Sequence, residues 1–242
     1  MKRNSRQTRK QKQSFEEEKP LDIKPISYKP AIEPLKAKTA NQQKYIDAIR
    51  SAKITFGIGP AGTGKTFIAG AVAVEMLLNN EIEQIIITRP AVEAGEDLGA
   101  LPGEKEEKYE PYIAAFRDVL NQRLGKGHVD YLLKTGKLVG EPFAYMRGKT
   151  FRNAVVILDE AQNATKSQMK LFLTRIGENC KVIVDGDSSQ ADIHNSGLDD
   201  AIARLAYIPA IKIVKFTQDD IVRSSIVSEI VQAYSADHFI KT

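Results

Sequence analysis

The chain has 242 residues, of which 42% are hydrophobic, and its formal net charge is +4. This size and composition are ordinary for one α/β domain with an added tail. No stretch approaches the roughly 18 apolar residues of a membrane span. The polar opening MKRNSRQTRK also lacks a signal-peptide pattern, so we expect a cytoplasmic protein without membrane contact. The single cysteine, Cys180, excludes an intramolecular disulfide.

The positive charge is concentrated near the N-terminus. Residues 1–38 hold 11 Lys and Arg residues against 5 Asp and Glu residues, together with four prolines. Because this stretch has no hydrophobic periodicity, we expect a basic, disordered or extended tail over residues 1–38 and one domain over residues 39–242. The tail is suited to contacts with nucleic-acid phosphates, and the alternative is a solvated segment without a partner.

Helical spacing and apolar runs then predict alternating elements. Residues 40–51 are expected to form a helix because Tyr45, Ile46 and Ile49 recur on one face. The apolar runs at 54–58, 84–88, 154–158, 181–184 and 211–216 predict five strands, and helical patterns such as 65–79 separate them. The fold class is therefore α/β, with a doubly wound, mainly parallel sheet of about five strands and ligands at the carboxyl ends of the strands.

An insert of about 65 residues, 89–153, separates the second and third predicted strands. Its middle, Tyr109–Leu124, has a helical pattern. Long ordered insertions commonly carry function, so the insert is a candidate surface on the substrate side. The alternative is a segment that only packs on the edge of the sheet.

The eight residues GPAGTGKT, from Gly59 to Thr66, have the spacing of a phosphate-binding loop and stand between a predicted strand and a predicted helix. Glycines permit backbone angles at which successive N–H groups surround phosphate oxygens at the positive end of the helix. Lys65 supplies a charge for the β- and γ-phosphates, and Thr66 offers a hydroxyl to Mg²⁺. A chance glycine-rich turn is the alternative. The expected nucleotide-binding residues in this region are Gly59, Pro60, Ala61, Gly62, Thr63, Gly64, Lys65, Thr66 and Phe67.

Acidic residues follow the third predicted strand. Asp159 stands where a Mg²⁺ partner is required, and Glu160 is suited to polarise a water for attack on the γ-phosphate. The alternatives are a helix N-cap for Asp159 and a solvated first-turn acid for Glu160.

Two further positions complete the candidate catalytic set of Lys65, Glu160, Gln190 and an arginine. Gln190, after the fourth predicted strand, can bond both a phosphate oxygen and the attacking water, although a tight turn is the other interpretation of this stretch. Arg223 is our candidate for the positive charge that hydrolysis requires, with Arg89 as the second choice. Either arginine could instead form a surface ion pair.

With these residues in place, the chain resembles the PhoH family of P-loop ATPases, which is related to the first motor domain of superfamily 1 helicases. The likeness covers about residues 39–235 and rests on TANQQKYIDAI, GPAGTGKT, TRPAVEAGEDLGALPGEKEEKYEPYIAAFRD, ILDEAQNAT, DGDSSQADI and DIVRSSIV. It implies a RecA-like, helicase-like domain that takes ATP and Mg²⁺, with Gln42 matching the glutamine that recognises adenine. It also implies a cytoplasmic homo-oligomer linked to RNA or phosphate-stress biology.

The expected function is therefore a Mg²⁺-dependent ATPase that couples hydrolysis to binding or remodelling of RNA or single-stranded DNA. A chain of this length leaves no room for a second motor domain, so we expect neighbouring subunits, in a ring such as a hexamer, to complete the site. The alternative is a nucleotide-gated assembly module with slow hydrolysis and no nucleic-acid substrate. A small-molecule kinase is disfavoured because DEAQ suits water activation, and GTP is disfavoured because no N-K-x-D sequence follows the loop.

Overall fold

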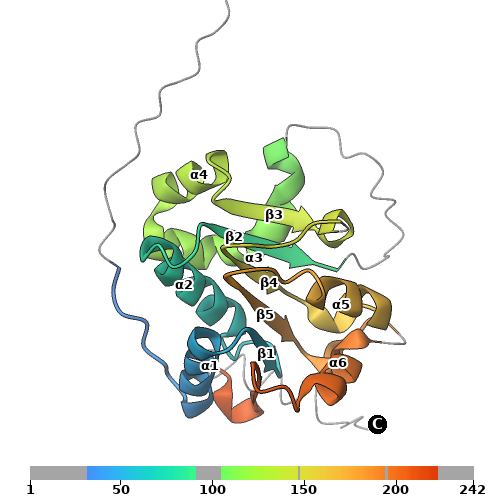
Figure 1. Ribbon diagram of the computed structural model, residues 1–242. Coiled ribbons are helices and arrows are strands. Elements are labelled where there is room, and N and C mark those ends of the chain that lie inside the picture. The colour runs from blue at the N-terminus through green and yellow to red at the C-terminus, as the bar shows by residue number, and fades with distance from the viewer. Residues whose placement is uncertain (1–31, 91–104, 147, 194–195, 223–242) are drawn as a thin grey trace, which may run out of the picture. The chain divides into compact units, whose positions relative to one another are not determined.

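A six-stranded sheet forms the centre of the protein in this computed structural model, which describes residues 32–90, 105–146, 148–193 and 196–222. The strand order is β3-β2-β4-β5-β1-β6, and every pairing is parallel. The expected α/β class with a doubly wound parallel sheet is confirmed (Figure 1). The strands are β1 (Ile54–Ile58), β2 (Gln84–Arg89), β3 (Leu138–Pro142), β4 (Ala154–Leu158), β5 (Cys180–Gly186) and β6 (Ile211–Lys215).

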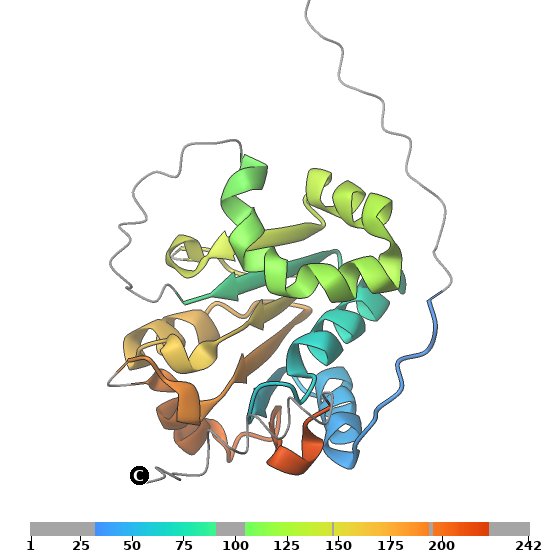
Figure 2. The same cartoon turned by 180° about the vertical axis from the view of Figure 1, so that it is seen from behind.

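Helices cover both faces of the sheet, and each face has its own apolar core. One of these faces is turned toward the viewer in Figure 2, where α3 (Lys105–Leu124) lies in front of the sheet. On that face lie α1 (Ala40–Ser51), α2 (Lys65–Leu78), α3 and α4 (Lys126–Lys134). On the other lie α5 (Lys166–Leu173) and α6 (Gly197–Leu205). Four short 3-10 helices complete the description: η1 (Phe143–Met146), η2 (Ala161–Asn163), η3 (Ser188–Gln190) and η4 (Gln218–Asp220).

Local sequence explains where several of these elements begin. The central strands β1 and β4 are buried at every position, as expected for strands covered on both faces. Thr39 caps α1 by accepting a hydrogen bond from the Gln42 N–H group at 3.2 Å. Thr165 and Gln168 form a reciprocal capping box at the start of α5. These local contacts mark the starts of α1 and α5.

The insert contains one strand that the sequence interpretation missed. Strand β3 pairs with β2 at the edge of the sheet, so the number of strands is six and not five. Its sequence, LVGEP, includes Gly140 and Pro142, which are both depleted in strand interiors and tolerated at sheet edges. The helix expected at 109–124 is present and begins earlier, at Lys105.

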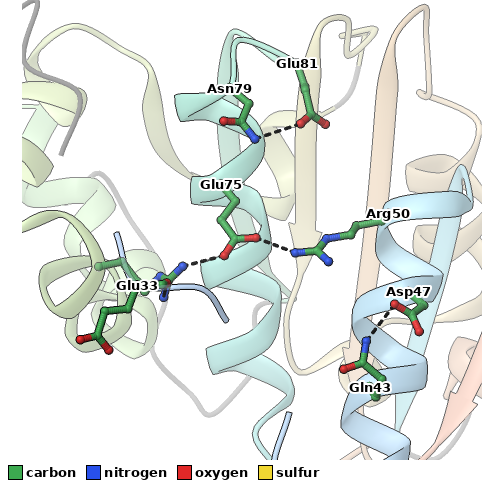
Figure 3. Close-up of polar contacts among 8 residues, drawn as sticks. Glu33, Gln43, Asp47, Arg50, Glu75, Asn79 and Glu81 are labelled. Carbon is green, nitrogen blue, oxygen red and sulfur yellow. Dashed lines mark hydrogen bonds and ion pairs between the residues drawn. The ribbon is translucent and has the colours of Figure 1, made fainter. Parts of the chain in front are cut away.

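The far end of α2 is held by ion pairs to two neighbouring helices. Glu75 accepts hydrogen bonds from Arg123 of α3 at 2.6 Å and from Arg50 of α1 at 2.8 Å. Figure 3 shows the bond between Glu75 and Arg50. Arg123 also donates to the Glu33 carbonyl at 2.6 Å. The segment just before α1 therefore packs on the domain, where Ile32, Leu35 and Ala37 contact the apolar core.

Within the ranges that the structure describes, no helix combines the length and apolar character needed to span a membrane.

Candidate nucleotide site

The glycine-rich loop between β1 and α2 has the backbone conformation that a phosphate cradle needs. Gly59, Gly62 and Gly64 have φ angles of 145°, 85° and 85°, which residues with a side chain rarely adopt. Gly64 is the N-cap of α2, so the loop ends at the positive end of that helix. A Cβ atom on Gly59 would lie 2.5 Å from the carbonyl oxygen of Phe216, the residue after β6, so the close approach of that backbone also demands glycine here.

Lys65 is held against the loop that it follows. Its Nζ donates to the Gly59 carbonyl at 2.6 Å and to the Pro60 carbonyl at 2.9 Å. Burial lowers the pKa of Lys65, and nearby carboxylates, Asp185 foremost, partly oppose that shift. Main-chain oxygens of the loop therefore hold the ammonium group in place. A bound phosphate chain would supply the negative charge that offsets it.

A cavity of about 460 Å³ lies beside the loop and collects most of the predicted site residues. It is lined by the loop, by the carboxyl ends of β2, β4 and β5, and by helix α3 of the insert. The residues of α3 at its wall, which sequence reasoning did not single out, are Ala115, Asp118 and Val119. Predicted residues at the wall are Ala61, Gly62, Gly64, Lys65, Thr66, Phe67, Arg89, Asp159, Glu160 and Gln190.

Asp159 is buried at the end of β4 and forms an ion pair with Arg89 at the end of β2. The Arg89 Nε donates to Asp159 Oδ2 at 3.0 Å, and Nη2 donates to the same oxygen. Burial raises the pKa of Asp159, while the guanidinium group of Arg89 acts in the opposite direction. Arg89, which the sequence offered as a second candidate for the charge on the γ-phosphate, is thus engaged with the proposed magnesium residue.

Glu160 has an unusual backbone conformation and a dedicated hydrogen-bond donor. Its φ of 54° lies in the left-handed region, which costs a residue of this kind on the order of 1 kcal/mol. Gln162, which is buried, donates from Nε2 to Glu160 Oε2 at 2.7 Å and accepts from the Asp187 N–H group at 3.1 Å. Gln162 therefore connects the exposed carboxylate after β4 to the end of β5, a role that sequence reasoning missed.

The remaining predicted residues have different positions. Gln190 lines the cavity, and its Nε2 donates to Asp187 Oδ2 at 2.7 Å. Gln42 is buried behind the loop, where Nε2 donates to the Thr63 carbonyl at 3.0 Å and Oε1 accepts from the Lys38 N–H group at 2.7 Å. Gln42 is thus in contact with the loop but is not among the residues at the cavity wall. Arg223 lies outside the described residues.

A buried carboxyl group that the sequence did not single out lies at the same cavity. Asp185, near the end of β5, is 1% exposed and accepts a hydrogen bond at Oδ1 from the hydroxyl of Tyr45 on α1. Burial raises the pKa of Asp185 to about 7, against the opposing effect of the Tyr45 hydrogen bond. Its Oδ2 is buried without a hydrogen-bond partner. The apolar strand that precedes Asp185 was the only sequence signal for this burial.

The donor set suits a hard divalent cation. Thr66 and Asp159, which carry oxygen donors, line the cavity, and Asp185, whose Oδ2 has no hydrogen-bond partner, lies at the same cavity. No cluster of three His, Cys, Asp or Glu side chains arranged as a metal site occurs in the described ranges. Mg²⁺ does not need such a cluster, because it commonly binds through one or two carboxylates, waters and phosphate oxygens.

A glycine-rich loop between β1 and α2, acidic residues at the ends of β4 and β5, and a parallel sheet together define the P-loop NTPase class. The family model described as PhoH-like protein matches residues 34–235. The chain therefore belongs to the PhoH-like protein family, and the resemblance drawn from the motifs is confirmed.

Curated relatives agree with this assignment. Protein PhoH of Escherichia coli K12 is 48% identical over 207 residues, which are 84% of this chain and 58% of that protein. The PhoH-like protein of Bacillus subtilis 168 is 47% identical over 203 residues, covering 83% of this chain and 64% of the relative. The chain thus spans about three fifths of the length of the curated relatives that it matches.

Solved structures with related topology are more distant. A Pif1 helicase structure from Candida albicans has a TM-score of 0.39 at 13% identity, covering 76% of this chain and 41% of the helicase chain. The SWI2/SNF2 ATPase core of Sulfolobus solfataricus in complex with dsDNA has a TM-score of 0.46 at 15% identity, covering 77% and 46%. These values describe a loose similarity of backbone and carry no information about what this chain binds.

Proposed function

We propose that the protein binds ATP together with Mg²⁺ and hydrolyses it to ADP and phosphate. The observation that carries the proposal is the convergence of the glycine-rich loop, Lys65, Asp159 and Glu160 on one cavity. A loop that only bound phosphate would not require an exposed carboxylate, held by Gln162, at the same cavity. Such a carboxylate is what water activation requires.

The chain's own residues account for the steps of hydrolysis. Main-chain N–H groups of the loop hold the phosphates, and Lys65 offsets the negative charge that they bring. Glu160 accepts a proton from a water as the water oxygen bonds to the γ-phosphorus, while the bond from that phosphorus to the β–γ bridging oxygen breaks. Thr66 and Asp159 would hold Mg²⁺, which neutralises charge on the β- and γ-oxygens when bound.

Arg89 affects how fast this reaction can proceed. Because its guanidinium group is bound to Asp159, it is less available to the γ-phosphate than its position after β2 suggested. We therefore propose that a further arginine, with Arg223 as candidate, supplies that charge across a boundary between subunits. The same ion pair favours the second candidate function, a nucleotide-gated assembly module with slow hydrolysis. Arg89 would have to release Asp159 before Asp159 could bind the cation, and this step would slow hydrolysis.

The coupled substrate is proposed to be RNA or single-stranded DNA. Support comes from the motif resemblance to helicase motor domains and from the surplus of positive charge in residues 1–38. This part of the proposal is independent of ATP binding.

The test combines turnover with solution mass. ATP hydrolysis is measured with and without single-stranded RNA or DNA, for the wild type and for Glu160→Gln, and mass is measured with and without ATP. We expect stimulated turnover in the wild type and at least a 100-fold loss in the variant, since a general base contributes about 10²–10⁴-fold. Turnover that is absent in the wild type, or unchanged in Glu160→Gln, would reject catalysis. ATP-dependent mass without nucleic-acid stimulation would favour the assembly module.

A further inference from the structure

Strand order places Asp185 between the two parts of the site already described. β5 lies between β1, which leads into the phosphate loop, and β4, which leads into Asp159. In the register of the sheet, Asp185 pairs with Gly57 of β1, and Val184 pairs with Leu158 of β4. Asp185 follows Val184 and Asp159 follows Leu158, so the two aspartates lie at the same level of the sheet. The backbones of adjacent strands are about 5 Å apart.

The surroundings of Asp185 are built to fix one of its oxygens. Tyr45, itself fully buried, donates its hydroxyl hydrogen to Oδ1. Gly57 makes room for this pair, because a Cβ atom at position 57 would lie 2.5 Å from Asp185 Oδ1 and 2.8 Å from the Tyr45 ring. Three elements, α1, β1 and β5, thus cooperate to hold a single carboxyl group at the cavity.

The second oxygen is the unusual feature. Asp185 Oδ2 is buried and has no hydrogen-bond partner, an arrangement that is unfavourable for a polar group and more so for a charged one. A side chain whose only role was to anchor Tyr45 would need one acceptor, and a hydroxyl or amide oxygen would serve at lower cost. A buried oxygen that is left unpaired at a ligand cavity indicates a partner that arrives with the ligand.

The charges around the cavity indicate which kind of partner. Asp159 already has Arg89 as its counter-ion, with two hydrogen bonds to one carboxylate oxygen. Lys65 exerts an electrostatic effect on Asp185, but its ammonium group donates hydrogen bonds to Gly59, Pro60 and Thr63. A polyphosphate would add further negative charge beside Asp185. An additional cation between the phosphates and this carboxyl group would relieve both repulsions.

We propose that Asp185 is a second carboxylate of the divalent-cation site, with Oδ2 as an oxygen donor toward the cation that accompanies the nucleotide. Tyr45 is the positioning residue that fixes the orientation of the carboxyl group. This inference rests on the proposed function, because it requires nucleotide and cation to bind in the same cavity.

The experiment measures coupling between cation and nucleotide, not turnover. The dissociation constant of a fluorescent ATP analogue is determined with excess EDTA and with excess Mn²⁺, and the ratio of the two constants gives the enhancement by the cation. Asp185→Asn keeps the shape of the side chain and an acceptor for Tyr45 while removing the charge. We expect it to reduce the enhancement at least 10-fold, since supporting residues of metal sites are worth about 10–100-fold in affinity.

Glu160→Gln is the matched control, because it removes one negative charge from the same cavity without touching the proposed donor. It is expected to change the enhancement less than about 3-fold, the effect of a modest change in local charge. An enhancement in Asp185→Asn that equals the wild-type value, or falls only as far as in Glu160→Gln, would overturn the inference. A wild type that binds no analogue under either condition would instead reject the proposed function itself.

A second variant keeps the test decisive if Asp185→Asn fails to fold. Tyr45→Phe preserves the carboxyl group and most of the packing and removes only the hydroxyl donor. We expect it to lower the cation enhancement more than about 3-fold, because losing one hydrogen bond to a charged group costs about 1.5 kcal/mol, or about tenfold, when fully expressed. An unchanged enhancement in this variant would overturn the inference, because a cation held by Asp185 must depend on the orientation that the Tyr45 hydroxyl gives to the carboxyl group.

Discussion

Replacing Glu75 by alanine tests how the insert is attached to the helix that carries the phosphate loop. Glu75 lies near the end of α2 and binds two arginines with different exposure. The side chain of Arg123 is 8% exposed, whereas that of Arg50 is 52% exposed. The two ion pairs should therefore contribute very different amounts to stability.

The magnitude follows from that difference. An exposed pair such as Glu75–Arg50 is worth about 0.5 kcal/mol, because solvent screens it. Removing one partner of a buried pair leaves an uncompensated charge and costs about 3–5 kcal/mol. Arg123 would keep its bond to the Glu33 carbonyl, and its Nε is already unpartnered. We therefore expect Glu75→Ala to lower the free energy of unfolding by about 3 kcal/mol.

Urea unfolding followed by circular dichroism measures this quantity, with Arg50→Ala as the matched control at about 0.5 kcal/mol. The double variant Glu75→Ala/Arg123→Met should recover part of the loss, because it removes the stranded charge and retains an apolar side chain of similar length. Equal losses for Glu75→Ala and Arg50→Ala would refute the reasoning. So would a double variant less stable than Glu75→Ala alone.

Three further outcomes are expected. Gly59→Ala should lose at least 10-fold in nucleotide affinity and about 1–3 kcal/mol in stability, since its φ of 145° and a carbonyl 2.5 Å from the new Cβ both oppose a side chain. The control Gly127→Ala, in open space on α4, should leave affinity unchanged and stability equal or higher. Gln162→Leu should lower kcat about 10-fold with little change in KM, because the proposed base loses its donor; a change in KM alone would contradict that role. Burial raises the pKa of Cys180 to about 11, so a thiol reagent at pH 8 should label it only after urea unfolding, and rapid labelling of the native protein would show that the β5 region opens.

Most of the fold could be predicted because its signals are local. Buried parallel strands are apolar along their whole length, so the runs at β1 and β4 were recognised with the bounds that the structure has. Helix α1 was recognised from its apolar face. Strand β3 was missed because its short sequence, with Gly140 and Pro142, carries no strand signal by itself. It is a strand because β2 offers a free edge beside it, which is tertiary information.

The site divides in the same way. The loop is recognisable because its glycines, Lys65 and Thr66 are contiguous and their spacing has a chemical reason. Arg89 and Asp159 are 70 positions apart in the sequence, and Tyr45 and Asp185 are 140 apart. Over such separations the sequence does not indicate which of the many possible partners a side chain contacts. Sequence also favours an exposed role for isolated acids, whereas Asp185 is nearly fully buried. The Arg89–Asp159 and Tyr45–Asp185 contacts therefore had to be read from the three-dimensional structure.

The strand order also arranges four of the charged residues at the cavity in a row. Across β1, β5, β4 and β2, the strand ends and the loop contribute Lys65, Asp185, Asp159 and Arg89 in turn. The row carries a positive group at each end and two carboxyl groups in the middle. A polyphosphate is attracted to the Lys65 end and repelled by the middle, whereas a divalent cation is attracted to the middle and repelled by both ends. Nucleotide and cation are therefore expected to bind cooperatively, because each neutralises the charge that repels the other from its place in the row.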